Sequence, residues 1–249
     1  MDWRDFVLGK HRYTCYMKKI HRFIGDFDLA KDEIVIADKE RVNHMRNVLK
    51  LFEGERISLC DGKGNDADAK IGLIEKEKII VHIISRFCNL AEPEREVTLF
   101  TAVLKGDNFD FIVQKATEIG VSHIVPIITE NTVKQGINKE RLERIALEAA
   151  ELSGRGIVPT IQNCLEFGEA IGFALAHCEL VYFFDTTGTK QNFKAGENRE
   201  IGLFVGPEGG WGDEERIMAS DAGCVFASLG PRVMRGETAA IIASYLACQ

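Results

Sequence analysis

Short runs of branched apolar residues, interrupted by polar ones, dominate the first third of the chain. They predict four strands, over residues 33–38, 56–60, 67–74 and 79–86. Asp61-Gly62-Lys63-Gly64 lies between the second and third runs and is typical of a hairpin turn, because glycine readily adopts the positive φ that such turns need. A helix is predicted over 39–51. Several short strands at this spacing favour a small barrel.

The pattern changes after a polar segment, 89–96 (NLAEPERE), which contains Pro93 and is typical of a linker. Beyond it, apolar runs predict strands at 97–104, 123–128, 180–184, 201–205 and 224–228. Apolar residues at helical spacing predict helices over 107–119, 139–152, 213–222 and 237–247. This alternation predicts an α/β domain with a mostly parallel sheet, in which ligands bind beyond the carboxyl ends of the strands.

Composition and charge narrow the class of protein. At 249 residues the chain is long enough for one large domain or two modest ones, and its hydrophobic content of 45% is ordinary for a globular protein. The net charge of −7 argues against a uniformly basic surface for nucleic acid. Two local runs are basic, however: residues 10–22 hold five Lys or Arg and no acid, and 39–50 hold four and one acid. Each run suits either an RNA contact or an ordinary solvated face.

The cysteines and histidines indicate no metal site. The seven cysteines are scattered without a C-x-x-C pair, and the six histidines lack ligand spacing. Small apolar core positions in a reducing compartment account for the cysteines. The N-terminus has no secretory apolar region, and the apolar stretch AAIIASYLAC near the C-terminus is about half as long as a membrane span requires. We therefore expect a cytoplasmic protein without a metal or a membrane anchor.

Two loops rich in glycine and proline form the candidate site. Gly206-Pro207-Glu208-Gly209-Gly210 follows the predicted strand 201–205, and residues 229–238 (LGPRVMRGET) follow the predicted strand 224–228. The chain has no P-loop, no G-x-G-x-x-G and no G-x-S-x-G, so the usual NTPase, dehydrogenase and hydrolase patterns are absent. The loops alone suit either well-made turns or a ligand site. Arg232 and Arg235 likewise suit either an anionic group or a surface ion pair with Glu237.

Several motifs together resemble the bacterial ribosomal RNA small-subunit methyltransferase E family, of the SPOUT superfamily. They are HMRNVLK at 44–50, Lys105-Gly106-Asp107, QKATEIGVSHIVPIIT at 114–129, GPEGGW at 206–211 and LGPRVMRGETAA at 229–240. The resemblance implies a PUA-like RNA-binding β-barrel over 17–90 and an α/β methyltransferase domain with a trefoil knot over 96–249. Residues 1–16 would be an extension. The chain departs from the family at Gly236, where a threonine is usual, and at Leu152, where a glutamine is usual.

The resemblance also implies a function. A homodimer would transfer a methyl group from S-adenosylmethionine to N3 of a uridine in 16S ribosomal RNA of the small ribosomal subunit. The expected cofactor contacts are Leu203, Gly206, Pro207, Glu208, Gly209, Leu229, Gly230 and Met234, with the glycines leaving room that a Cβ would fill. Arg235 would stabilise negative charge on the uracil, with Glu237 as a candidate proton acceptor or simply a first-turn helix residue.

The expected RNA contacts are basic residues that would hold phosphates: Lys18, Lys19, Arg22, Arg46, Lys50, Lys105, Arg155 and Arg232. Two alternatives remain open. One is a non-catalytic RNA-binding or assembly relative, favoured by Gly236. The other is a knotted methyltransferase that acts on another RNA.

Overall fold

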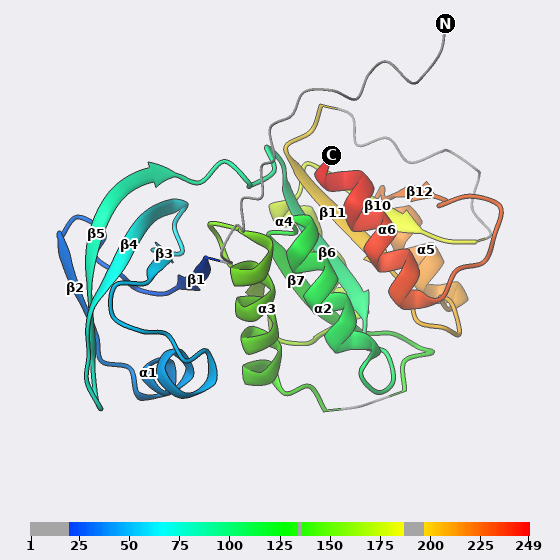
Figure 1. Cartoon of the computed structure of the whole chain (residues 1–249). Helices are drawn as coiled ribbons and strands as arrows, with labels where there is room; N and C mark the ends of the chain where they lie inside the picture. Colours follow the sequence, from blue (N-terminus) through cyan, green and yellow to red (C-terminus); the bar gives the residue numbers. More distant parts are fainter. Residues whose placement is uncertain (1–19, 134–135, 187–196) are drawn as a thin grey trace, which may run out of the picture.

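Two lobes, each built on its own sheet, make up the protein (Figure 1). The computed structural model describes residues 20–133, 136–186 and 197–249. The strands of the N-terminal lobe lie within residues 21–88, and those of the C-terminal lobe lie within residues 96–227. The predicted extension over 1–16 lies outside the described residues, and the predicted domain boundaries remain predictions.

The N-terminal sheet has five strands. Their order is β1 (His21–Ile24), β3 (Arg56–Cys60), β4 (Asn65–Ile74), β5 (Ile79–Cys88) and β2 (Glu33–Ile36). β1 pairs with β3 in parallel, and the other neighbours are antiparallel. β1, which the apolar pattern did not predict, and β2 are the two edges of the sheet. Backbone pairing among the described strands therefore does not close the predicted barrel, although the sheet curves around a buried core that includes Ile57, Leu59 and Ile71.

The helix predicted over 39–51 is shorter than expected. α1 spans Lys39–Asn43 and continues as a π-helical turn, His44–Val48. It begins where the Asp38 side chain accepts a hydrogen bond from the backbone of Arg41 at 2.8 Å. It ends before Lys50, whose φ of 53° is incompatible with a right-handed helix.

The C-terminal sheet is parallel throughout, which confirms the predicted α/β class. Its order is β12 (Val225–Ala227), β10 (Leu180–Phe184), β11 (Glu200–Val205), β6 (Glu96–Ala102), β7 (His123–Ile128) and β8 (Thr160–Ile161), and β9 (Leu165–Glu166) also pairs with β7. Because all these strands run in one direction, their carboxyl ends meet at one edge of the sheet.

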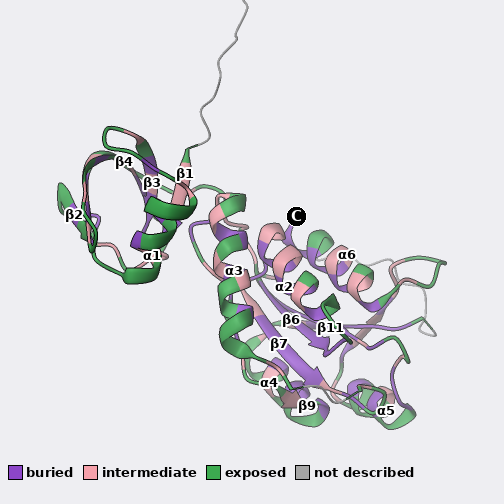
Figure 2. Ribbon diagram, turned by 60° about the horizontal axis from the view of Figure 1, so that its bottom comes forward, coloured by how far each residue is buried: buried purple, intermediate pink, exposed green. Residues whose placement is uncertain are grey.

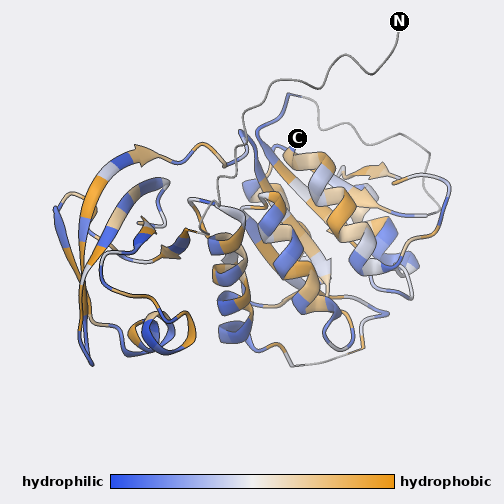
Figure 3. Ribbon diagram, viewed as in Figure 1, coloured by the Kyte–Doolittle hydropathy of each residue, from blue (hydrophilic) through white to orange (hydrophobic). Residues whose placement is uncertain are grey.

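Helices cover both faces of this sheet. One face carries α2 (Asn108–Ile119), α3 (Lys139–Ser153) and α6 (Gly236–Cys248), and the other carries α4 (Phe167–His177) and α5 (Asp213–Asp221). Alternate residues of β6 supply the two cores: Leu99 packs beneath α2 and α6, whereas Phe100 packs beneath α4 and stacks on Phe204 with ring centroids 4.5 Å apart. The central strands are accordingly buried and apolar, and the outer face of α3 is exposed and polar, whereas α6 is largely apolar and exposes Tyr245 and Leu246 (Figures 2 and 3).

The sequence pattern did not predict α4. Gly168 and Gly172 weaken its helical signal, because glycine is a poor helix former. Its N-terminus is nevertheless well capped: the Glu169 side chain accepts a hydrogen bond from the Glu166 backbone at 3.1 Å. Packing of the apolar face of α4 on the sheet then supplies the stability that the helix propensity of its residues does not provide.

Candidate functional site at the carboxyl ends of three strands

A cavity of about 290 Å³ opens at the carboxyl ends of β10, β11 and β12. The two predicted loops, 206–210 and 229–234, form much of its wall. The remaining wall comes from residues that are not among the expected cofactor contacts: Phe184, Asp185, Thr186, Val205, Trp211, Arg216, Ala227, Ser228, Gly236 and Ala239. The topology therefore brings both loops to one site, as expected for the carboxyl edge of a parallel sheet.

Of the expected cofactor residues, all but Leu203 line this cavity. Gly206, Pro207, Glu208, Gly209, Leu229, Gly230 and Met234 are in its wall. Leu203 is fully buried in the core beneath α2 and α6 and does not reach the cavity. Its position two residues before the end of β11 points its side chain into that core, so the structure does not support it as a contact.

The glycines of the 206–210 loop are required by the protein's own packing. A Cβ on Gly206 would lie 2.9 Å from the indole of Trp211, and a Cβ on Gly209 would lie 3.0 Å from Asn131. Gly210 has a φ of +72°, which other residues rarely adopt. The structure thus gives two of these glycines a packing role: Gly206 leaves room for Trp211, and Gly209 leaves room for Asn131. That the glycines also leave room for a ligand remains a prediction.

Trp211 and Glu215 hold this loop in place. The indole N–H of Trp211 donates to the carbonyl of Phe184 at 2.8 Å, which ties the loop to the end of β10. The buried carboxylate of Glu215 accepts from the backbone N–H groups of Gly212 at 2.7 Å and Glu130 at 2.9 Å. The loop is thus fixed to the ends of both β10 and β7, and the cavity wall is preformed.

A buried ion pair lies beside the cavity. Arg216 on α5 donates from Nε to the carboxylate of Asp185 at 2.7 Å, and Asp185 follows directly after β10. The hydrogen bond to Asp185, together with the charges of Asp185 and Asp213, raises the pKa of Arg216. One sequence signal could have indicated Asp185: its carboxylate comes directly after a predicted buried strand, and polar residues at that position are common in ligand sites.

The second loop carries both predicted arginines. Arg232 lines the cavity and is exposed. Arg235 precedes α6 and is 84% exposed, with its guanidinium 4.0 Å from the carboxylate of Glu237. One carboxylate oxygen of Glu237, Oε2, is buried without a hydrogen-bond partner in the described chain. Glu237 itself is not part of the cavity wall.

The structure divides the expected RNA contacts. Arg46, Lys50, Lys105 and Arg232 are exposed, and Lys18 and Lys19 lie outside the described residues. Arg22 and Arg155 were expected to hold phosphates, but their guanidinium groups are turned into the protein, with side chains 11% and 3% exposed. Both make ion pairs there, so this part of the prediction is wrong.

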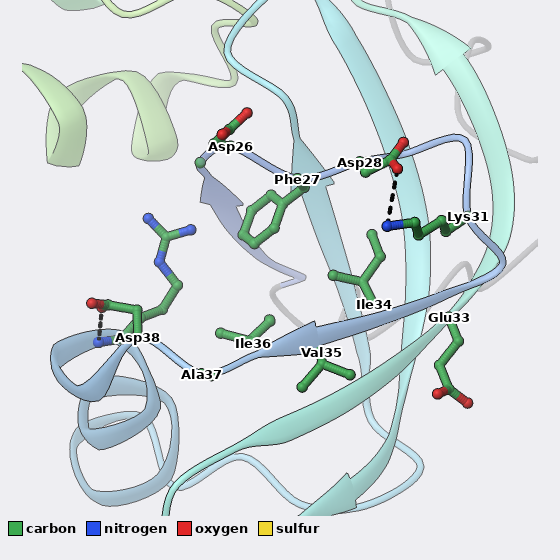
Figure 4. Close-up of a pocket in the computed structure, with 12 residues that line it drawn as sticks. Asp26, Phe27, Asp28, Lys31, Glu33, Ile34, Val35, Ile36, Ala37 and Asp38 are labelled. Atoms are coloured by element: carbon green, nitrogen blue, oxygen red, sulfur yellow. Dashed lines mark hydrogen bonds and ion pairs between the residues drawn. The ribbon is translucent and has the colours of Figure 1, made fainter.

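A second hollow, of about 520 Å³, lies in the N-terminal lobe beside β2 (Figure 4). Its wall includes four carboxylates, Asp26, Asp28, Glu33 and Asp38, and two cations. Lys31 is paired with Asp28 at 3.2 Å, and Arg41 donates to the carbonyl of Ile24 at 2.7 Å. Carboxylates here would repel phosphate groups, and the hollow is remote from the glycine loops. The cavity in the C-terminal lobe is therefore the better candidate for a nucleotide-like ligand.

The chemistry of that cavity suits a nucleoside bearing positive charge. Pro207, Leu229 and Met234 offer apolar walls to a ring, while the loop backbone offers hydrogen-bonding groups. The carboxylate of Glu208 is in the wall, is exposed and suits a cationic group, whereas that of Asp185 is already paired with Arg216. In the described residues, no group of three or more His, Cys, Asp or Glu is arranged to hold a metal ion.

Comparisons with known proteins agree with this geometry. The RNA methyltransferase domain family matches residues 91–247, and the RNA methyltransferase PUA domain family matches residues 36–84. Ribosomal RNA small subunit methyltransferase E of Synechocystis is 32% identical over 212 residues, which cover 82% of this chain and 69% of that protein. The chain belongs to this methyltransferase family. The Rickettsia conorii member is 28% identical over 234 residues, or 90% of this chain and 93% of the relative.

Solved structures of the family share the fold. A methyltransferase from Legionella pneumophila in complex with S-adenosylmethionine superposes with a TM-score of 0.83 at 27% identity, covering 92% of this chain and 97% of that one. The ribosomal RNA small subunit methyltransferase E of Neisseria gonorrhoeae, bound to S-adenosylmethionine, gives 0.80 at 29% identity, covering 90% and 95%. The family's PUA domain thus accounts for the N-terminal sheet. In the described ranges, no helix is long and apolar enough to cross a bilayer.

Proposed function

We propose that the protein methylates N3 of a specific uridine in 16S ribosomal RNA of the small subunit, with S-adenosylmethionine as methyl donor. The observation that carries the proposal is the cavity at the carboxyl ends of β10, β11 and β12, walled by both glycine loops. The family membership supports the reaction class. The target nucleotide and the N3 position come from the resemblance and are the parts that need testing.

S-adenosylmethionine is proposed to bind in this cavity, and the residues present fit it. Apolar walls from Leu229 and Met234 suit the adenine, and the exposed carboxylate of Glu208 suits the cationic sulfonium or ammonium. When bound, this cofactor supplies an electrophilic methyl group. The protein's contribution is a rigid wall, fixed by Trp211 and Glu215, which orients the reacting atoms and excludes water.

Arg235 is proposed to face the uracil. Uridine N3 is a poor nucleophile while protonated, and loss of its proton places negative charge on the ring carbonyls. A guanidinium beside them would stabilise that charge. Arg235 fits because it is largely exposed and lies in the chain between Met234 and Gly236, which are both in the cavity wall.

Glu237 is proposed to orient Arg235, through the 4.0 Å ion pair, and to serve as the candidate proton acceptor. Its Oε2 is buried and has no hydrogen-bond partner among the described residues, so this oxygen is available to accept a hydrogen bond. Because Glu237 is not part of the cavity wall, the 229–238 loop would have to bring the uridine to its carboxylate.

The RNA would lie across the exposed basic residues Arg46, Lys50, Lys105 and Arg232, with Lys18 and Lys19 as further predicted contacts. A trefoil knot, a homodimer and a cytoplasmic location remain predictions from the resemblance and the sequence.

The decisive experiment uses labelled S-adenosylmethionine and small ribosomal subunits from a strain that lacks the modification. Methylation at N3 blocks Watson–Crick pairing, so reverse transcription of the product would stop at the modified uridine. We expect one stop with the wild-type protein, and a reduction in turnover of about 10²–10³ for Arg235→Ala with cofactor affinity retained.

Three other results would overturn parts of the proposal. Label transfer without a stop in 16S RNA would indicate another target. Cofactor binding without transfer would favour the non-catalytic relative. Failure to bind S-adenosylmethionine would reject the methyltransferase function itself.

A further inference from the structure

A network of buried polar contacts joins the two lobes. At its centre, Arg22 of β1 makes two hydrogen bonds of 2.7 Å to the carboxylate of Asp66 and a third, also 2.7 Å, to the carbonyl of Arg155 in the other lobe. Asn89 donates both to Asp66 at 2.7 Å and to the carbonyl of Gly154 at 2.9 Å. Asp66 is 2% exposed, so these bonds are shielded from water.

Arg155 continues the network on the methyltransferase side. Its guanidinium donates to the carbonyls of Thr117 and Val121 at 3.1 and 2.7 Å, and it pairs with Glu92 at 2.7 Å. Glu92 also accepts from the backbone N–H of Gly156 at 2.8 Å. The segment that links the two lobes is therefore bonded to the C-terminal lobe through Glu92.

Two further contacts cross between the lobes. The N–H of Ile24 donates to the carboxylate of Glu151 on α3 at 2.8 Å, and the N–H of Gly64 donates to the carbonyl of Gly156 at 3.2 Å. Gly156 must be glycine for this approach, because a Cβ would lie 2.7 Å from the Asn89 side chain. Ile24, Cys60 and Ala150 form a small apolar core at the same place.

We propose that Arg22 and Arg155 act as positioning residues: they form a buried joint, the Arg22–Arg155 joint, that fixes the orientation of the RNA-binding lobe relative to the methyl-transfer cavity. This inference rests on the proposed function, since it assumes one RNA substrate held by both lobes. Interfaces between domains of one chain are ordinarily loose enough to allow relative motion. Here the charged groups of both lobes are paired and shielded from water. Because the lobes already have a fixed orientation, RNA binding does not include a free-energy cost for ordering them.

Cys60 provides a built-in reporter of the joint. Its side chain is fully buried, and its thiol donates to the carbonyl of Gly156, across the joint, at 3.3 Å. Opening of the joint would expose this thiol to an alkylating reagent. Cys224, buried beneath α5 in the other lobe, reports whether the methyltransferase lobe itself remains folded.

The test compares Arg22→Lys with Arg56→Lys in the full-length protein. Lysine retains the charge but loses the forked contact to Asp66 and Arg155. Arg56 is a matched control, because it pairs with Asp68 at 3.2 Å on the exposed side of the same sheet. Peptide mapping after timed alkylation gives the rates at Cys60 and Cys224, and near-ultraviolet circular dichroism checks the folding of both lobes.

For Arg22→Lys we expect faster alkylation at Cys60, unchanged alkylation at Cys224, unchanged affinity for S-adenosylmethionine, and a KM for small subunits that rises about tenfold with kcat preserved. Arg56→Lys should match the wild type. A second pair strengthens the test: Glu151→Ala should behave like Arg22→Lys, whereas Glu151→Gln keeps an acceptor for Ile24 and should restore wild-type values.

Two outcomes would overturn the proposal. One is slow Cys60 alkylation in Arg22→Lys, which would show that the joint does not depend on this arginine. The other is fast Cys60 alkylation with an unchanged KM, which would show that the joint does not position the RNA. Failure of the proposed function is distinguishable, because it would appear as absence of methyl transfer by the wild-type protein.

Discussion

The guanidinium of Arg216 lies 2.7 Å from the carboxylate of Asp185 at the edge of the cavity, and the Asp185 side chain is only 4% exposed. The two residues come from different elements, the end of β10 and the middle of α5. Because they are far apart in the sequence, no local pattern predicts that they form a pair. The pair fixes α5 against the strand end that forms part of the cavity wall.

We expect Arg216→Ala to weaken both folding and cofactor binding. Removing the arginine takes a charge-assisted hydrogen bond away from the buried carboxylate of Asp185, which should cost about 1–3 kcal/mol in the free energy of unfolding. Thermal denaturation and calorimetric titration with S-adenosylmethionine measure the two effects. Arg144→Ala, at an exposed position of α3, is the control and should leave both quantities within error. A variant as stable as the wild type would contradict the structural role of the pair.

A methyl group added at Gly206 should damage the site. Its Cβ would lie 2.9 Å from the Trp211 indole, so Gly206→Ala must displace the ring and should cost about 1–3 kcal/mol in unfolding free energy, with weaker cofactor binding. Gly172→Ala is the matched control, because Gly172 lies within α4 with open space at the Cβ position. There we expect stabilisation of roughly 0.5–1 kcal/mol. Chemical denaturation compares the two, and equal effects would show that crowding at Trp211 is unimportant.

The stability contributed by Glu151 should depend on pH. Burial raises the pKa of its carboxyl above the ordinary value of 4.5, and the hydrogen bond from the Ile24 N–H lowers it only in part. A raised pKa means that the folded state binds more protons than the unfolded state between the two pKa values. The free energy of unfolding therefore falls as pH rises through that interval.

Glu151→Gln removes this titration. We expect the unfolding free energy of the wild type, measured relative to Glu151→Gln, to decrease as the pH rises above the ordinary carboxyl pKa of 4.5. Urea denaturation at a series of pH values provides the measurement. A difference that stays constant or increases with pH would show that Glu151 is not the group responsible.

The native cysteines should differ sharply in reactivity. Burial raises the pKa of Cys60 and that of Cys224 to about 11, so both thiols are protonated and inaccessible at neutral pH. Cys88 is exposed. We expect iodoacetamide to modify Cys88 first, and Cys60 and Cys224 only after denaturant is added, as followed by mass spectrometry. Early modification of Cys224 would contradict the packing beneath α5.

Arg232 should contribute to RNA binding through charge. We expect Arg232→Ala to weaken binding to a 16S RNA fragment and to reduce the slope of log K against log salt concentration by about 1. The exposed Arg144→Ala again provides the control, because α3 does not border the cavity. An unchanged slope would remove Arg232 from the RNA-binding surface.

The sequence by itself determined the class of fold and the position of the site. Apolar runs such as 180–184 and 201–205 form buried strands whichever strands they pair with. A loop that follows a parallel strand must lie at the carboxyl edge of the sheet. For this reason the 206–210 and 229–238 loops were predicted as one site before their contacts were known. The π-helical end of α1 and the glycine-weakened α4 were predicted poorly, because tertiary packing outweighs local propensity there.

Only the tertiary structure decided what the charged residues do. An arginine in the sequence is equally suited to a phosphate, a carboxylate or a carbonyl, and its environment selects among them. Arg22 and Arg155 meet carboxylates and carbonyls where the lobes touch, so they serve the joint. Arg232 meets no carboxylate within the described ranges and is exposed at the cavity. Asp185 and Arg216 find each other only because the parallel sheet places the end of β10 beside α5. Long-range pairing of this kind depends on the whole chain path, which no local pattern records.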